Sequence, residues 1–139
     1  MSNVNYNVLL IEDEEYKCNH MKQALTNNAI KNIVHKETAV DALQYLADEN
    51  PKPDLIILDM QFPMRYGDGP STRCGLFVLE ELNRLEYNIP VIMCSFGCYD
   101  IPKHITDVIG YILFDYGRDF TDTIAAYLEK LEEMKDAGM

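Results

Sequence analysis

The chain has 139 residues and a formal net charge of -11, from 23 acidic and 12 basic residues. Apolar residues make up 47% of the sequence and charged residues 25%, which is typical of a globular domain and argues against a disordered chain. The acidic excess disfavours direct binding to nucleic acid, because it would repel the phosphate backbone. Since the sequence shows neither a membrane-length apolar run nor an export signal, we expect one cytoplasmic domain over residues 1–139, with no membrane contact.

The cysteines Cys18, Cys74, Cys94 and Cys98 are expected to be reduced thiols, because nothing in the sequence directs export. Cys94 and Cys98 could bind zinc together with His104, but their spacing matches no standard pair of zinc ligands. Burial as small apolar side chains is the favoured interpretation.

The first half of the chain predicts two strands and two helices. Residues 7–13, "NVLLIED", form a continuous apolar run that ends in an acidic pair and predict a strand, and residues 15–27 then show helical spacing. Residues 32–37 alternate in polarity, which indicates a strand at a sheet edge, and a helix follows at 38–50 with Thr38 as its N-cap. The residues expected on the buried sides of these helices are Tyr16, Met21, Ala24 and Leu25, and Val40, Leu43 and Leu46.

The second half continues the alternation. Residues 54–59, "DLIILD", are too apolar for a strand with one face in water, so they predict a central strand. The remaining elements are a helix, a buried strand, one or two helical turns, a strand and a long helix, at residues 75–87, 91–96, 100–108, 110–114 and 119–139. The inward side of the last helix is predicted to carry Phe120, Ile124, Tyr127, Leu131 and Met134.

This order of elements predicts a doubly wound α/β domain, in which five parallel strands in the flavodoxin-like order 2-1-3-4-5 carry helices on both faces. Ligands of such sheets bind beyond the carboxyl ends of the strands. Glu12 and Asp13 end the first strand, Asp59 ends the third and Ser95 ends the fourth. Because the first and third strands are neighbours in this order, we expect the three carboxylates to share one crevice.

Three carboxylates in one crevice would repel one another, by roughly 4 kcal/mol for two charges about 4 Å apart at an effective dielectric of 20. Mg²⁺ resolves this conflict, because it is a hard cation that takes oxygen ligands. It would also offset the charge of an incoming phosphoryl group while Asp59 attacks as the nucleophile. The alternative is structural: Glu12 and Asp13 begin the following helix, and Asp59 caps a turn.

These strand ends resemble, over essentially the whole chain, the receiver domain of two-component response regulators, the CheY-like superfamily. "LLIEDEE" resembles the family's acidic strand and "LIILDMQFP" its phosphoacceptor strand, while "VIMCS" and "GYILF" resemble the strands with the switch hydroxyl and the aromatic switch residue. By this resemblance Asp59 is the phosphoacceptor. Mg²⁺ would be bound by Glu12, Asp13, Asp59 and the backbone carbonyl of Gln61.

The resemblance also implies a switch, in which Ser95 hydrogen-bonds to the phosphoryl group and Tyr111 rotates inward as Ser95 moves. It implies a stand-alone receiver of a two-component phosphorelay, with no output domain and no enzymatic activity of its own. Its partners would be a sensor histidine kinase or phosphotransfer protein and a downstream protein. The alternative is a degenerate receiver that binds proteins without phosphorylation. A phosphatase fits poorly, because Gln61 stands where a second carboxylate is needed.

Two departures from the family concern charge near the site. The family has a Lys-Pro pair three residues after its aromatic switch, where this chain has Phe114 and Asp115. The lost lysine removes a charge-assisted hydrogen bond to the phosphoryl group. The loop after Asp59 is also longer than usual, and the open hypotheses are that Arg65, Arg73 or Lys103 replaces the lysine, or that nothing does.

A third departure is the short segment between Ser95 and Gly110, which Gly97 and Pro102 interrupt. We expect the family's fourth helix to be stunted or irregular there. Receivers commonly contact partners or dimerise through this surface, so the usual homodimer stays an open alternative.

Overall fold

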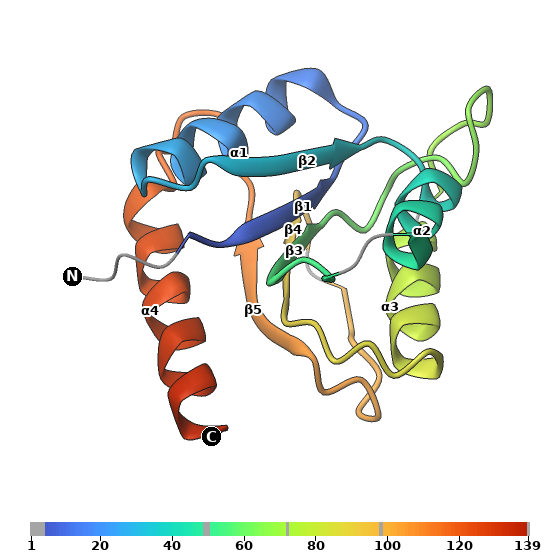
Figure 1. Cartoon of the computed structure of the whole chain (residues 1–139). Coiled ribbons are helices and arrows are strands. Elements are labelled where there is room, and N and C mark those ends of the chain that lie inside the picture. Colours follow the sequence, from blue (N-terminus) through green and yellow to red (C-terminus); the bar gives the residue numbers. More distant parts are fainter. Residues whose placement is uncertain (1–4, 49–50, 72, 98, 139) are drawn as a thin grey trace.

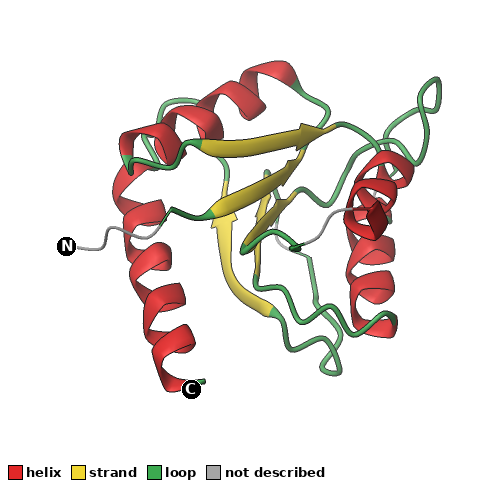
Figure 2. Cartoon of the chain, in the orientation of Figure 1, coloured by secondary structure: helices red, strands yellow, loops and turns green. Residues whose placement is uncertain are grey.

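The computed structural model describes residues 5–48, 51–71, 73–97 and 99–138 of the chain. Within these residues five strands form one parallel sheet in the order β2-β1-β3-β4-β5, which confirms the predicted doubly wound topology (Figure 2). The strands are β1 (Asn7–Ile11), β2 (Asn32–Lys36), β3 (Leu55–Leu58), β4 (Val91–Ser95) and β5 (Val108–Leu113). The partly exposed β2 is an edge strand, as its alternating polarity predicts.

The helices cover both faces of the sheet (Figure 1). They are α1 (Glu15–Asn27), α2 (Ala39–Asp48), α3 (Cys74–Arg84) and α4 (Thr121–Ala137). The pair α1 and α4 packs on one face, and α2 and α3 pack on the other. The hydroxyl of Thr38 accepts a hydrogen bond from the Asp41 N–H at 3.1 Å, which confirms the predicted N-cap of α2.

Burial on both faces explains the continuous apolar runs. In β1, Val8 and Leu10 join the core beneath α1 and α4, whereas Leu9 and Ile11 join the core beneath α2 and α3. All four side chains are at most 1% exposed. The central strands are thereby fixed in register, and their carboxyl ends meet along one edge of the sheet.

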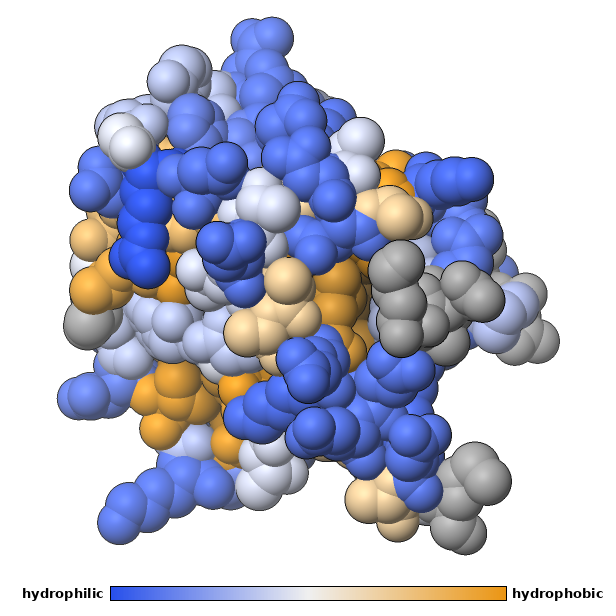
Figure 3. All heavy atoms as spheres, turned by 90° about the vertical axis from the view of Figure 1, so that its left-hand side faces the viewer, coloured by the Kyte–Doolittle hydropathy of each residue, from blue (hydrophilic) through white to orange (hydrophobic). Residues whose placement is uncertain are grey.

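Some residues expected on the buried sides of the helices lie at the surface instead. Tyr16 is 53% exposed, Val40 39% and Met134 41%. On the buried side of α1, the position expected for Tyr16 is occupied by its neighbour Lys17, which is 1% exposed. The face that carries α1 and α4 is covered mainly by hydrophilic residues (Figure 3), and Glu129 lies exposed on α4.

The connection from β4 to β5 contains no helix in its described residues, 96–97 and 99–107. The expected helical turns at 100–108 are therefore wrong, and the expected loss of a regular fourth helix is confirmed. A tight turn remains, in which the Ile105 N–H donates to the Pro102 carbonyl at 3.0 Å. Cys98 lies outside the described residues, so the suggested grouping of Cys94, Cys98 and His104 cannot be placed; Cys18, Cys74 and Cys94 are buried free thiols.

Among the described residues, no helix combines the length and the apolar character that a membrane span requires.

Candidate functional site

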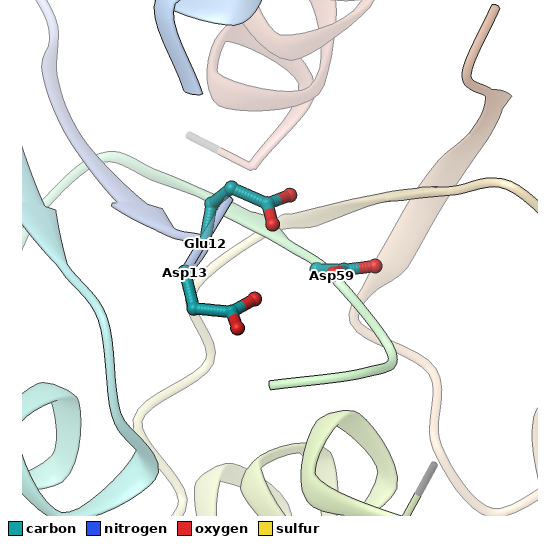
Figure 4. A group of neighbouring side chains, drawn as sticks. All are labelled: Glu12, Asp13 and Asp59. Carbon is teal, nitrogen blue, oxygen red and sulfur yellow. The ribbon is translucent and has the colours of Figure 1, made fainter. Parts of the chain in front are cut away.

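The predicted carboxylates come together at the carboxyl ends of β1 and β3. These strands are neighbours, with Ile11 opposite Leu58, so the residues that follow them share one edge of the sheet. Glu12, Asp13 and Asp59 each place a carboxylate oxygen within 4.8 Å of the others. Figure 4 shows the three side chains extending to the same side of the sheet edge. The shared crevice expected from the strand order is therefore present.

The two strand ends hold these residues firmly. Glu12 is 3% exposed and Asp59 5%, whereas Asp13 is half-buried. The Asp59 N–H donates to the Ile11 carbonyl at 3.2 Å, which continues the pairing of β1 and β3 by one residue. The Met60 N–H donates to Asp59 Oδ1 at 2.8 Å and orients that carboxylate.

Burial and mutual repulsion shift the protonation of the cluster. Burial, followed by the charge of Asp59, raises the pKa of Glu12 to about 8, although Lys17 acts in the opposite direction. Burial also raises the pKa of Asp13, with a further contribution from Asp59. Both shifts come mainly from the removal of the carboxylates from water, and a nearby cation would oppose them.

Among the described residues, the cation in direct contact with the carboxylates is a lysine that was not among the predicted site residues. Lys17, in the first turns of α1, places Nζ 2.9 Å from Glu12 Oε1 and 2.9 Å from Asp59 Oδ1. Burial alone would lower the pKa of the Lys17 ammonium, but Glu12 and Asp59 outweigh burial and raise it. Lys17 is therefore a charged, fully buried bridge between the two strand ends.

Helix geometry explains how Lys17 reaches the site. Side chains of an α-helix lean toward its N-terminus, and α1 starts directly above the ends of β1 and β3. Aromatic rings flank the ammonium: the ring centroid of Phe96 lies 5.1 Å from Nζ and that of Phe114 lies 5.8 Å away. Phe114 occupies the position at which the family has its lysine, so the ammonium from α1 lies beside the place of the missing one.

The spacing of residues in the sequence does indicate that Lys17 lies on the buried side of α1. Lys17 follows Asp13 by four residues and precedes Met21 by four, so it belongs to the buried side of α1 that also includes Leu25. The periodicity alone did not separate Lys17 from Tyr16 as the first member of that side, and a lysine is rarely buried without partners.

The three cations proposed from sequence lie elsewhere. The acidic cleft, a hollow of about 250 Å³, is lined by residues that include Glu12, Asp13, Lys17, Asp59, Gln61 and Ser95. Among the described residues, neither Arg65, Arg73 nor Lys103 lines this cleft, and all three are exposed. A bridge between Phe62 and Ser71 closes the base of the long loop, which projects away from the sheet beside α2 (Figure 1).

The long loop leads into a glycine, Gly75, that lies directly against the backbone of Asp59. The Gly75 N–H donates to the Met60 carbonyl at 3.0 Å, at the start of α3. A Cβ atom on Gly75 would lie 2.5 Å from the Asp59 carbonyl oxygen and 2.6 Å from Met60 Cα. Only glycine permits the backbone to approach so closely.

Ser95 and Tyr111 are also joined at the cleft. The hydroxyl of Ser95, buried at the end of β4, lies 2.8 Å from the hydroxyl of Tyr111 on β5. Both hydroxyls donate toward the Gly97 carbonyl, at 2.7 Å and 2.6 Å. The aromatic residue expected to rotate inward thus already has its hydroxyl at Ser95.

The donor set fits a hard divalent cation. Mg²⁺ prefers carboxylate oxygens, and the cleft offers three within coordinating reach of one another, with Gln61 at its rim. The raised pKa values of Glu12 and Asp13 indicate a need for further positive charge. Lys17 meets part of that need, so a cation that takes the same Glu12 and Asp59 oxygens would compete with its ammonium.

Comparison with known proteins agrees with this geometry. The family model for the response regulator receiver domain matches residues 8–106. A comparison with curated protein sequences gives no significant match.

Several solved structures share the fold. The signal receiver domain of a Luxo repressor protein from Vibrio parahaemolyticus is 23% identical, with a TM-score of 0.69 over 96% of this chain and 98% of that one. A CheY-like receiver domain protein from Methanospirillum hungatei is 20% identical, with a TM-score of 0.67 over 96% and 99% of the chains. The phosphorylated cyanobacterial phytochrome response regulator RcpA is 24% identical, with a TM-score of 0.66 over 91% and 93%. The match of the family model over most of the sequence places this chain in the response regulator receiver domain family.

Proposed function

We propose that this receiver accepts a phosphoryl group on Asp59 in a Mg²⁺-dependent reaction and signals through a protein partner, as one step of a two-component phosphorelay in the cytoplasm. The observation that carries the proposal is the convergence of Glu12, Asp13 and Asp59 at the carboxyl edge of the sheet. Such a cluster is unfavourable without a cation and is suited to one. The phosphorylated state described for RcpA belongs to a protein of the same fold.

The chemistry assigns one role to each group. A carboxylate oxygen of Asp59 attacks the phosphorus of a phosphohistidine on a kinase or phosphotransfer protein. The O–P bond forms as the P–N bond breaks, and the histidine nitrogen keeps the electron pair and takes up a proton. When bound to Glu12, Asp13, Asp59 and the Gln61 carbonyl, Mg²⁺ supplies charge that offsets the phosphoryl oxygens. Ser95 donates a hydrogen bond to one of those oxygens.

In this account the chain is a phosphoryl acceptor rather than an enzyme with a separate substrate. Water later attacks the acyl phosphate, which releases inorganic phosphate and restores the Asp59 carboxylate. The acceptor oxygen is already oriented, because the contacts to Asp59 from described residues fall on Oδ1, from Met60 and Lys17. That arrangement supports Oδ2 as the attacking atom.

A second candidate is a degenerate receiver that binds a partner without phosphorylation. The observation in its favour is the Lys17 ammonium, which pairs with Glu12 and Asp59 and offsets part of their charge from within the chain. If this bridge never opens, the ammonium keeps the Glu12 and Asp59 oxygens that Mg²⁺ would need. The two functions differ in whether Asp59 reacts.

Acetyl phosphate with Mg²⁺ distinguishes them. In this reaction acetate leaves as Asp59 takes the phosphoryl group, and intact mass spectrometry counts the groups added. We expect one group on the wild type, none on Asp59→Asn, and normal labelling of the control Asp68→Asn in the exposed loop. Chelation of Mg²⁺ should abolish labelling. Absence of any label on the wild type at saturating Mg²⁺ would establish the degenerate receiver instead.

A further inference from the structure

We propose that Lys17 is the phosphoryl-binding lysine of this receiver, and that its ammonium competes with the divalent cation for Glu12 and Asp59 while Asp59 is unphosphorylated. The inference rests on the proposed function of Asp59. It assigns to α1 a role that the recognised motif of the family places after the fifth strand.

The first support is position. Lys17 Nζ lies 2.9 Å from Asp59 Oδ1, so it is in direct contact with the proposed phosphoacceptor. It also lies 5.8 Å from the ring centroid of Phe114, which replaces the family's lysine. An ammonium from α1 therefore lies in the same corner of the site as the residue that replaces the family's lysine. A short movement of its tip would bring it from Asp59 Oδ1 to an oxygen of a phosphoryl group on Oδ2.

The second support is the unfavourable solvation of Lys17. Its side chain is 2% exposed, and a lysine is almost never buried so completely unless it is paired. An apolar side chain at this buried position would carry no desolvation penalty. Among the described residues its ion-pair partners are Glu12 and Asp59, so the site itself accounts for a lysine at this place.

The third support is competition for the same oxygens. Nζ contacts Glu12 Oε1 and Asp59 Oδ1, two members of the acidic cluster that would hold the metal. Mg²⁺ binds its ligands at roughly 2.0–2.1 Å, so an ion on these two atoms would lie close to the ammonium, and the two positive charges would repel each other. The flexible stem of a lysine allows Nζ to move aside, which a guanidinium of fixed geometry would do less readily.

The aromatic surroundings link Lys17 to the switch. Phe96, whose ring lies 5.1 Å from Nζ, follows Ser95 directly in the chain. If Ser95 turns toward a phosphoryl group, the backbone that carries Phe96 moves with it. Lys17 and Ser95 would then bind the phosphoryl oxygens together, while the ring of Phe114 remains beside the ammonium.

The test compares Lys17→Met with Lys31→Met. The second variant removes an equal charge from an exposed position just before β2, at the amino end of that strand and so away from the acidic cleft. Calorimetric titration measures Mg²⁺ affinity. We expect Lys17→Met to bind Mg²⁺ at least about tenfold more tightly than the wild type, because a competing charge has been removed. Lys31→Met should bind as the wild type does. Equal Mg²⁺ affinities in Lys17→Met and the wild type would overturn the competition.

Fluorine NMR of the beryllofluoride complex, saturated with Mg²⁺, measures binding of a phosphoryl mimic. Loss of a charge-assisted hydrogen bond predicts at least about tenfold weaker binding by Lys17→Met than by the wild type. Undiminished binding would overturn the phosphoryl-binding role. If the wild type itself binds no beryllofluoride, the proposed function fails, whereas the Mg²⁺ comparison still decides whether Lys17 competes with the metal.

Two precautions keep the test decisive. Circular dichroism and thermal unfolding establish that Lys17→Met folds, and Lys17→Gln, which retains a hydrogen-bond donor for Glu12, is made alongside it. On the wild type, NMR of the lysine Nζ groups should show the Lys17 signal change both on addition of Mg²⁺ and on addition of beryllofluoride. An unchanged Lys17 signal at saturation with both would refute the proposal without any substitution.

Discussion

The hydroxyl of Ser95 lies 2.8 Å from the hydroxyl of Tyr111, and the Gly97 carbonyl accepts from both. The two residues expected to act as a switch therefore share one acceptor while Asp59 is unphosphorylated. A Ser95 hydroxyl that turns toward Asp59 must leave this arrangement, and Tyr111 then keeps Gly97 alone. Phosphorylation would thus exchange one hydrogen-bond network for another.

Tyr111→Phe should destabilise the resting protein. The change deletes the hydroxyl that contacts Ser95 and Gly97, and a hydrogen bond of this kind contributes about 1 kcal/mol. We expect the free energy of unfolding, measured in urea, to fall by about 1–2 kcal/mol without ligand. With beryllofluoride bound the loss should be smaller, because Ser95 has then turned away. The control Tyr66→Phe, at an exposed position in the long loop, should have little effect in either state.

The pH dependence of stability should reveal Glu12. Its pKa is raised from 4.5 to about 8 by burial and by Asp59, so between these values the folded state holds a proton that the unfolded state has lost. Stability of the metal-free protein should therefore decrease as pH rises through this window, by at most about 1.4 kcal/mol per pH unit from this group. Urea unfolding at several pH values measures the slope.

Glu12→Gln is the matched variant for this measurement, since it cannot lose the proton. Its stability should fall less steeply than that of the wild type between pH 5 and pH 8, whereas the exposed control Glu129→Gln should follow the wild type. Mg²⁺ should stabilise the wild type more at the upper end of the window, because binding requires the carboxylate. Parallel slopes for the wild type and Glu12→Gln would contradict the raised pKa.

The loop cations should be dispensable for phosphorylation. Arg65, Arg73 and Lys103 are exposed and do not line the acidic cleft among its described residues. Alanine at each position should leave the rate of labelling by acetyl phosphate unchanged, whereas Lys17→Met should alter it. Stopped reactions followed by mass spectrometry give these rates. A several-fold lower labelling rate in Arg65→Ala or Arg73→Ala would show that the long loop contributes to phosphorylation.

The fold and the acidic trio could be predicted because each depends on a local pattern. The residues Leu55–Leu58 are apolar at every position before the Asp59 carboxylate, which favours a strand buried on both faces. The strand order then places Glu12 and Asp59 on neighbouring strand ends. The structure of the β4–β5 connection was harder to predict from the sequence. Gly97 and Pro102 disfavour a helix there, but their presence does not exclude one or two helical turns.

Lys17 could not be predicted in the same way, because its burial depends on partners that only the folded chain supplies. A lysine is normally assigned to the surface, and here two carboxylates from different strands compensate its desolvation. Tyr16 and Lys17 are consecutive, so a shift of one position on the helix exchanges an aromatic ring for a cation. Hydrophobic periodicity favours the ring, whereas the electrostatics of the site favour the lysine.

Gly75→Ala should be strongly destabilising, because the new methyl group would lie 2.5 Å from the Asp59 carbonyl oxygen and 2.6 Å from Met60 Cα. Both atoms belong to the backbone of the segment that directly follows β3, so they cannot move aside as a flexible side chain could. We expect a loss of about 1–3 kcal/mol in urea unfolding, and weaker Mg²⁺ binding as Asp59 is displaced. Gly69→Ala is the control, because a Cβ there meets nothing within 4 Å. Equal stability of the two variants would show that α3 can withdraw from Asp59 without cost.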